Sequence, residues 1–268
     1  MPFATPLARL AAACTLALGA VAPALAADAF PSRPITVVIP FPPGGATDVL
    51  GRVIGQKLGD TLGQTVVVEN RAGAGTIIGA SYVAKAAPDG YTVLVSSGTT
   101  FTVNPAIRNN LPYDPVKSFD PIGIAGRTGL ILLANKDVPV QTVKQFVDYV
   151  KASPDKYAYG SFGSGTTAQF AGEIVLSATG LKMTHVPYKG SAPAMTDLMG
   201  GQIPFTVDTV SAAIPQLKSG KIKAIAVTTA KRSALLPDVP TMAENGYPDI
   251  NMDLSLIHIS EPTRQEAI

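Results

Sequence analysis

A glycine-rich loop between a strand and a helix constrains the fold of this chain most strongly. Residues 41–48 read FPPGGATD, an apolar run at 35–39 precedes them, and a segment with helical spacing of apolar residues follows them. The two adjacent glycines let a ligand approach the backbone without a Cβ in the way, and Thr47 or Asp48 can cap the helix. The unpaired N–H groups at the start of that helix predict an anion site. The competing interpretation of an isolated PPGG is an ordinary connecting turn.

The same order of strand, glycine-rich loop and helix recurs along the chain. The sequence GAG at 73–75 follows a β-like run at 65–69, and GSGTT at 163–167 follows another at 157–161. Strands that alternate with helices predict an α/β fold with doubly wound, mainly parallel sheets, whose ligands bind at the carboxyl ends of the strands. Because these loops fall at that edge, the pattern favours a site for a small polar ligand.

Two breaks in this order predict two lobes joined by two hinge crossings. Prolines interrupt the pattern between residues 104 and 129, and the apolar run 223–228 reads as the return crossing. We therefore expect the first lobe at 27–124, the second lobe at 125–224, and a return to the first lobe at 225–253.

The first 26 residues have the pattern of a secretory signal peptide. Arg9 precedes an apolar run at 10–21, and Ala24-Leu25-Ala26 supplies the small residues of a cleavage site, so we expect export and cleavage near Ala26. The single cysteine, Cys14, lies in this segment, which leaves the mature chain without a thiol. Lipid attachment at Cys14 is the alternative. The net charge of +2 and the lack of basic runs argue against a nucleic-acid partner.

Two enzyme classes compete with a binding function. The glycines of residues 73–79 resemble a dinucleotide-binding loop, but the next strand ends without the Asp or Glu that would bind a ribose. A secreted hydrolase of the common type would need a Gly-x-Ser-x-Gly elbow, which surrounds no serine here. His185 is the one histidine before residue 254, so His and Cys ligands are lacking and we expect neither a metal nor a cofactor.

Five motifs, in this order, resemble the Bug family, the extracytoplasmic solute receptors of tripartite tricarboxylate transporters. They are residues 41–48, 68–75, 87–92, 186–190 and 236–241, and the resemblance runs from about residue 30 to residue 253. It implies a periplasmic, two-lobed binding protein of type II-like architecture that is not an enzyme. Such a protein closes on a small carboxylate-bearing solute and presents it to a membrane permease of the tripartite tricarboxylate type. We expect it to be a monomer.

The resemblance implies that both lobes donate hydrogen bonds to the ligand carboxylate. In the first lobe the implied ligand-binding residues are Phe41, Gly44, Gly45, Thr47, Asp48, Ser97 and Thr99. In the second lobe they are Ser161, Thr166, Thr167, Gln169, Gly190, Ser191 and Asp208. Asp48 would brace the first loop, and Asp208 would accept from a ligand amine or a bridging water. Each hydroxyl could instead be an ordinary helix cap. Gln169 stands where the family often has His, which leaves its contact open, and Arg127 could be a ligand contact or a solvated surface residue.

The motif pattern that resembles the Bug family ends at Asp253. Residues 254–268 match nothing expected at that place, and we interpret them as a non-native tail. On that interpretation the first lobe is truncated and would expose apolar sheet surface.

Overall fold

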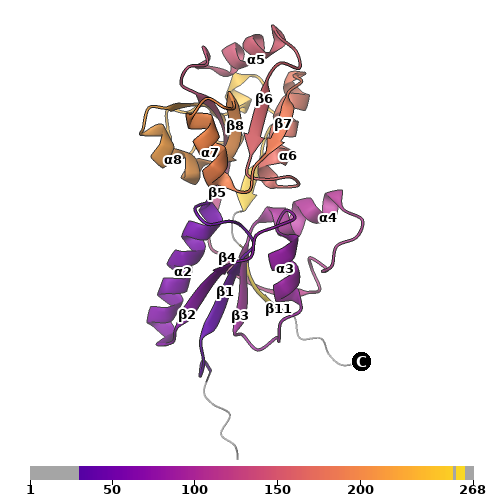
Figure 1. Ribbon diagram of the computed structural model, residues 1–268, viewed down its shortest axis with the longest axis vertical. Helices are drawn as coiled ribbons and strands as arrows, with labels where there is room; N and C mark the ends of the chain where they lie inside the picture. Colours follow the sequence, from indigo (N-terminus) through magenta and orange to yellow (C-terminus); the bar gives the residue numbers. More distant parts are fainter. Residues whose placement is uncertain (1–29, 256–257, 263–268) are drawn as a thin grey trace, which may run out of the picture. The chain divides into compact units, whose positions relative to one another are not determined.

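Two mixed β-sheets carry the fold, and helices cover both faces of each sheet (Figure 1). The computed structural model describes residues 30–255 and 258–262, so the expected signal peptide and part of the expected tail lie outside the described residues. From Arg33 onward the chain forms one compact unit, to which the following description applies. The lobe boundaries near residues 27 and 125 stay predictions.

The first sheet contains the strand that leads into the FPPGGATD loop. Its strand order is β2-β1-β3-β11-β4; β1 is parallel to β2 and β3, while β11 is antiparallel to β3 and β4. The elements are β1 (Ile35–Ile39), α2 (Ala46–Leu62), β2 (Val66–Asn70), α3 (Ile77–Ala84), β3 (Thr92–Ser96), the π-helix η2 (Thr99–Val103), α4 (Asn104–Ile107), β4 (Phe119–Ile124) and β11 (His258–Pro262).

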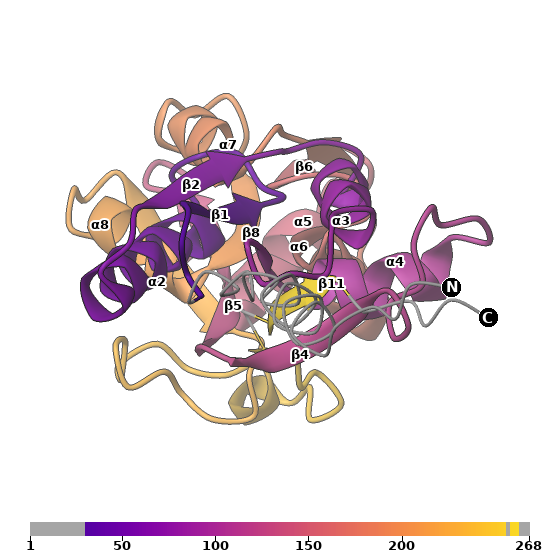
Figure 2. The same ribbon diagram turned by 90° about the horizontal axis from the view of Figure 1, so that it is seen from below.

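Helices α2 and α3 lie on opposite sides of β1 (Figure 2). Because successive strand residues point to opposite faces, Val37 and Ile39 pack towards α2, while Val38 packs against Ala80 and Val83 of α3. Helix α2 comes close to the sheet at Gly51, where a Cβ would lie 2.6 Å from Ile39 Cδ1. The predicted doubly wound arrangement is therefore present in the first sheet.

The second sheet has the strand order β10-β5-β8-β6-β7, with β9 beside β5. Strand β6 is parallel to β7 and β8, whereas β5 is antiparallel to β8, β9 and β10. The sheets are therefore mixed rather than mainly parallel. The elements are β5 (Arg127–Asn135), α5 (Val143–Lys151), β6 (Ala158–Ser161), α6 (Thr167–Thr179), β7 (Thr184–Pro187), α7 (Ser191–Met199), β8 (Phe205–Thr209), α8 (Val210–Leu217), β9 (Ile222–Val227), the 3-10 helix η3 (Ala243–Asn245) and β10 (Asp253–Ser255).

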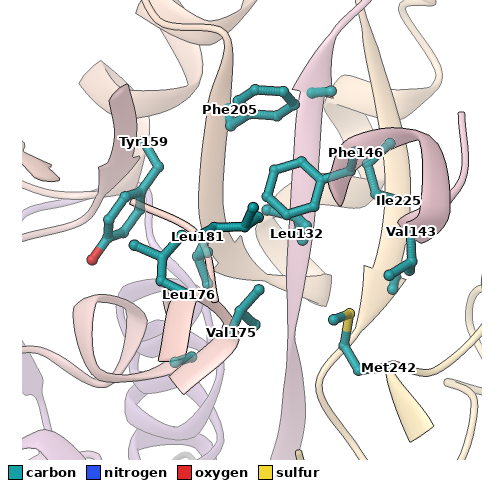
Figure 3. Packing of buried hydrophobic residues seen from close by; sticks show 14 of the residues in the cluster. Leu132, Val143, Phe146, Tyr159, Val175, Leu176, Leu181, Phe205, Ile225 and Met242 are labelled. Carbon is teal, nitrogen blue, oxygen red and sulfur yellow. The ribbon is translucent and has the colours of Figure 1, made fainter. Parts of the chain in front are cut away.

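The largest core cluster lies on the face of the second sheet that α5 and α6 cover (Figure 3). Phe146 of α5 and Phe205 of β8 meet edge to face, with ring centroids 5.0 Å apart. Ile131 and Leu133 point to the opposite face, where they pack in a second cluster with Leu198 of α7. The alternation along β5 thus buries apolar residues on both faces.

The prediction that residues 225–253 return to the first lobe is wrong. Strand β9 pairs with β5 in the second sheet, and Met242 N donates to Val227 O. Ile225, Met242 and Ile250 are fully buried in the same cluster as Phe205 (Figure 3 shows Ile225 and Met242). The apolar run 223–228 reads as a crossing in the sequence, but its residues form most of β9, which pairs with β5 in the second sheet.

The segment that we interpret as a non-native tail supplies strands to both sheets. Strand β10 pairs with β5, and β11 pairs with both β3 and β4. The position between β3 and β4 is thus occupied by residues 258–262. The non-native origin of residues 254–268 stays a prediction.

Candidate functional site

Loops at the carboxyl ends of strands from both sheets line one small pocket, which we call the donor pocket. Its free volume of about 30 Å³ is room for one or two water molecules. The lining residues are Phe41, Pro42, Gly45, Ala46, Thr47, Ser97, Phe162, Thr167, Gly190, Ser191, Asp208 and Thr209.

The starts of three helices reach the donor pocket without a side-chain cap. The N-cap residues are Gly45 of α2, Thr166 of α6 and Gly190 of α7, and none of these helices has a side-chain hydrogen bond at that position. The N-caps of α5 and α8, Thr142 and Thr209, have hydroxyls that each accept from a backbone N–H inside the helix, and Thr209 also lines the pocket. Helices α2 and α7 therefore present N–H groups to the pocket, and α2, α6 and α7 direct the positive ends of their dipoles towards it.

Asp48 holds the glycine loop in place. Its Oδ2 accepts from Gly44 N at 3.0 Å and from Arg52 Nε at 3.2 Å, and its Oδ1 accepts from Asn70 Nδ2 at 2.8 Å. Burial would raise the pKa of this carboxyl, but the hydrogen bonds from Arg52, Gly44 and Asn70 outweigh it and lower the pKa. Asp48 is therefore ionised and engaged within the protein, and it does not line the donor pocket.

Asp208 is a buried carboxyl at the wall of the donor pocket. Ser191 Oγ donates to its Oδ2 at 2.6 Å, and Thr209 N donates to its Oδ1 at 2.7 Å. The side chain is fully buried, and this burial raises its pKa to about 6 in spite of those hydrogen bonds. Asp208 can therefore accept a hydrogen bond when ionised or donate one when protonated.

Helices η2 and α6, which follow strands of different sheets, also make direct contact beside the pocket. Thr167 N, at the start of α6, donates to Thr99 Oγ1 at 3.2 Å, and Thr99 Oγ1 donates to Thr167 Oγ1 at 3.4 Å. Ser97 Oγ accepts from Thr99 N at 3.3 Å and lies at the pocket wall. Thr99 therefore contacts the second sheet rather than the pocket.

The structure brings eight of the fourteen predicted site residues to the donor pocket. They are Phe41, Gly45, Thr47, Ser97, Thr167, Gly190, Ser191 and Asp208. Of the other six, Gly44, Asp48 and Thr99 support the loops as described. Gln169 Oε1 accepts from Gly165 N at 2.7 Å, so its side chain shapes the loop before α6.

Ser161 and Thr166 do not line the donor pocket. Ser161 Oγ lies 2.7 Å from His185 Nε2 and donates to Gly163 O at 3.1 Å. Thr166 Oγ1 donates to Gly163 O at 2.7 Å and lines a neighbouring cavity instead. Their predicted contact with a ligand carboxylate thus has no geometric support in the donor pocket.

The serine and histidine pair does not resemble a catalytic centre. The ring of His185 packs against Tyr159, with centroids 5.0 Å apart, and Tyr159 OH donates to Glu173 Oε1 at 2.6 Å. Burial lowers the pKa of His185. Since neither Ser161 nor His185 lines the donor pocket or the cavity beside it, the pair is placed to tie β6 to β7.

Within residues 30–255 and 258–262, no group of three or more His, Cys, Asp or Glu side chains could hold a metal ion. In that same part of the chain, no helix is long and apolar enough to cross a membrane.

A larger cavity, which we call the side cavity, adjoins the donor pocket. Its volume is about 680 Å³, and it shares Phe41, Pro42, Phe162 and Gly190 with the donor pocket. Its other lining residues are Pro40, Ala72, Gly73, Ala74, Gly75, Thr76, Arg108, Gly163, Ser164, Thr166, Pro187, Tyr188 and Lys189. The sequence predicted neither Phe162 nor Arg108. Phe162 directly follows a strand end, a signal that was available, whereas nothing in the sequence places Arg108 beside these loops.

Two α/β sheets whose strand ends face one pocket define the class of periplasmic solute-binding proteins. Solved structures agree with this class. "Structure of periplasmic binding protein BugD" matches with a TM-score of 0.83 and 38% identity, over 88% of this chain and 79% of that chain. "R. palustris Rpa4515 with adipate" matches with a TM-score of 0.85 and 36% identity, over 89% of this chain and 79% of that chain.

The chain belongs to the TctC family, the tripartite tricarboxylate transporter family receptors, which it matches over residues 50–267. It is also 38% identical to Protein BugT of Bordetella pertussis over 235 residues, which are 87% of this chain and 72% of that protein. The resemblance to the Bug receptors is thereby confirmed. The family match runs past Asp253, where the motif pattern ends.

Proposed function

We propose that this receptor binds a small carboxylate-bearing solute in the donor pocket and releases it chemically unchanged. The observation that carries the proposal is that α2 and α7 begin at this pocket without a side-chain cap, while α6 begins there with its first N–H bonded to Thr99 Oγ1. A carboxylate offers several acceptor sites for their N–H groups, and its negative charge suits the positive ends of three helix dipoles. The structural neighbour solved with adipate, a dicarboxylate, supports the same ligand chemistry.

Binding requires the sheets to separate and to close again. The donor pocket has a free volume of about 30 Å³, and the contacts between Thr99 and Thr167 close it at one side. A solute therefore enters a more open arrangement, and it favours closure only through contacts that it makes better in the closed state. Micromolar affinity corresponds to about 8 kcal/mol, which several charge-assisted hydrogen bonds can supply after ordering costs.

The setting of this activity is part of the proposal. A signal peptide cleaved near Ala26 would deliver the chain to the periplasm, where it would act as a monomer and pass its solute to a tripartite tricarboxylate-type permease. The family match supports this role as a receptor and not as an enzyme.

Calorimetry with acids and matched amides tests the proposal. We expect the protein to bind at least one dicarboxylate from a panel and to bind the corresponding diamide at least about 10-fold more weakly, because the amide lacks the charge. Thr47→Val should weaken binding of that acid by about 10-fold, since Thr47 lines the donor pocket. Thr196→Val is the matched control, because Thr196 is exposed on α7 and its hydroxyl donates only to Ala192 O. Equal affinity for acid and amide, or no binding of any acid by folded protein, would contradict the proposal.

A further inference from the structure

The side cavity is large enough to take the far end of a solute that is held in the donor pocket. Its volume of about 680 Å³ lies in the range of about 300–1,000 Å³ that small-molecule sites occupy. The two spaces share four wall residues, so they adjoin each other. A solute whose first carboxylate lies in the donor pocket would extend the rest of its chain into the side cavity.

An arginine reaches the side cavity between loops of the two sheets. Arg108 follows α4, and its Nε donates to Asn104 Oδ1 at 3.2 Å. Its Nη2 lies 3.1 Å from the place where a Cβ on Gly165 would stand and 3.7 Å from the corresponding place on Gly75. Gly165 and Gly75 have left-handed φ values, +67° and +62°, which favour glycine. The backbone conformation thus keeps a Cβ out of the space beside the guanidinium at both positions.

Arg108 has no ion-pair partner in the part of the chain that the structure describes. Among the ion pairs of the described residues, none joins Arg108 to an Asp or Glu side chain. The other cation at this cavity, Lys189, is exposed and likewise has no such pair. Among the described residues its terminal nitrogens donate no hydrogen bond, and a half-buried guanidinium in this state is suited to bind a carboxylate through two parallel hydrogen bonds.

The wall between the two spaces is aromatic. Phe41 from the first sheet and Phe162 from the second meet edge to face, with ring centroids 6.3 Å apart and planes 82° apart. Both residues line the donor pocket and the side cavity. The middle of a solute that spans the two spaces would therefore pass apolar rings, and each of its ends would meet hydrogen-bond donors.

We propose that Arg108 binds a second anionic group of the solute and selects acids with two anionic ends and an apolar middle. This inference rests on the proposed function, because it assumes that the first carboxylate occupies the donor pocket. Arg108 is then a specificity-determining residue, and Lys189 adds positive charge at the cavity mouth.

Calorimetry with matched acids tests this inference. The probes are succinate, glutarate, adipate and pimelate, each compared with the monoacid of equal length, such as hexanoate for adipate. We expect the best diacid to bind about 10- to 100-fold more tightly than its monoacid. Arg108→Gln should remove most of this difference and leave monoacid affinity unchanged, while Arg108→Lys should retain part of it. Arg33→Gln is the matched control, because Arg33 pairs with Asp89 on the surface.

The possible results separate the two proposals. If diacids and monoacids bind the unaltered protein equally, or if Arg108→Gln weakens both kinds of acid to the same extent, the role of Arg108 in selection is overturned. If no acid of either kind binds, the proposed function itself fails, and the role of Arg108 fails with it. Thermal melts of each variant establish that it is folded, and hexanoate binding serves as a second measure of an intact donor pocket.

Discussion

Replacing Ala46 by proline removes one N–H group from the donor pocket with little disturbance of α2. Ala46 is the first residue of the helix, where proline is well tolerated because its missing N–H has no partner within the helix. The preceding Gly45 has φ −84° and ψ 171°, an extended conformation that is compatible with a following proline. The variant should therefore fold, with stability within about 1 kcal/mol of the unaltered protein.

The expected loss of affinity follows from the charge of the ligand. A hydrogen bond to a charged group contributes about 1.5–3 kcal/mol, so Ala46→Pro should weaken carboxylate binding by about 10- to 150-fold. The proline ring also stands in front of the nitrogen, which adds to the loss. At a ligand concentration of 100 times the original Kd, binding stabilises the unaltered protein by about 2.7 kcal/mol. A 30-fold weaker complex at the same concentration would contribute about 0.9 kcal/mol.

Thermal unfolding with and without ligand measures this difference, and calorimetry gives the Kd directly. For a chain of this size the ligand-induced rise in Tm should fall from roughly 5–11 °C to roughly 2–4 °C. Ala46→Gly is the matched control, because it keeps the N–H group and alters only the side chain. An unchanged Kd in a folded Ala46→Pro variant would refute the role of the α2 start in ligand binding.

Three further changes probe other parts of the structure. The pKa of Asp208 is about 6 in the folded protein against an ordinary value of 3.8. The contribution of Asp208 to the free energy of unfolding should therefore fall by about 3 kcal/mol as the pH rises from about 4 to 6, and stay constant above pH 6. Urea unfolding of Asp208→Asn at the same pH values should lack this fall. Gly79→Ala should lower the free energy of unfolding by about 1–3 kcal/mol, because the new Cβ would lie 2.7 Å from Arg71 O. Gly123→Ala is the control, because there is open space around Gly123. Equal urea midpoints for the two variants would argue against this close packing. Met242→Ala should cost about 2–5 kcal/mol in the same assay if residues 225–253 belong to the core of the second sheet, and a change below 1 kcal/mol would contradict that placement.

The sequence predicted the helix starts at the site well, because their signals are local. A glycine or threonine after an apolar run and before a helical pattern places α2, α6 and α7 at the carboxyl edge of the strands. Helix α8, which contains Pro215, was not predicted. Helices η2 and α4 at residues 99–107 were not predicted.

Side-chain direction and strand pairing depended on tertiary contacts that the sequence does not show. Ser161 lies at a strand end like the other site residues, yet its hydroxyl contacts His185 on the neighbouring strand and does not line the pocket. The apolar run of β9 could equally leave the sheet or join it, and in the structure it pairs with β5. Arg108 became a candidate only because α4 brings it between two loops from different sheets.

The pair formed by Asp48 and Arg52 sets the sign of the electric field at the start of α2. Asp48 follows Thr47 in the first turn of α2 and its carboxylate binds the glycine loop. Its negative charge alone would therefore repel an anion at that helix start. Arg52 Nη2 lies 3.0 Å from Asp48 Oδ1 and also donates to Asn70 Oδ1 at 2.7 Å, which cancels the charge without loosening the loop. One acidic residue can therefore order an anion site from within, provided that a cation one turn along the same helix balances it.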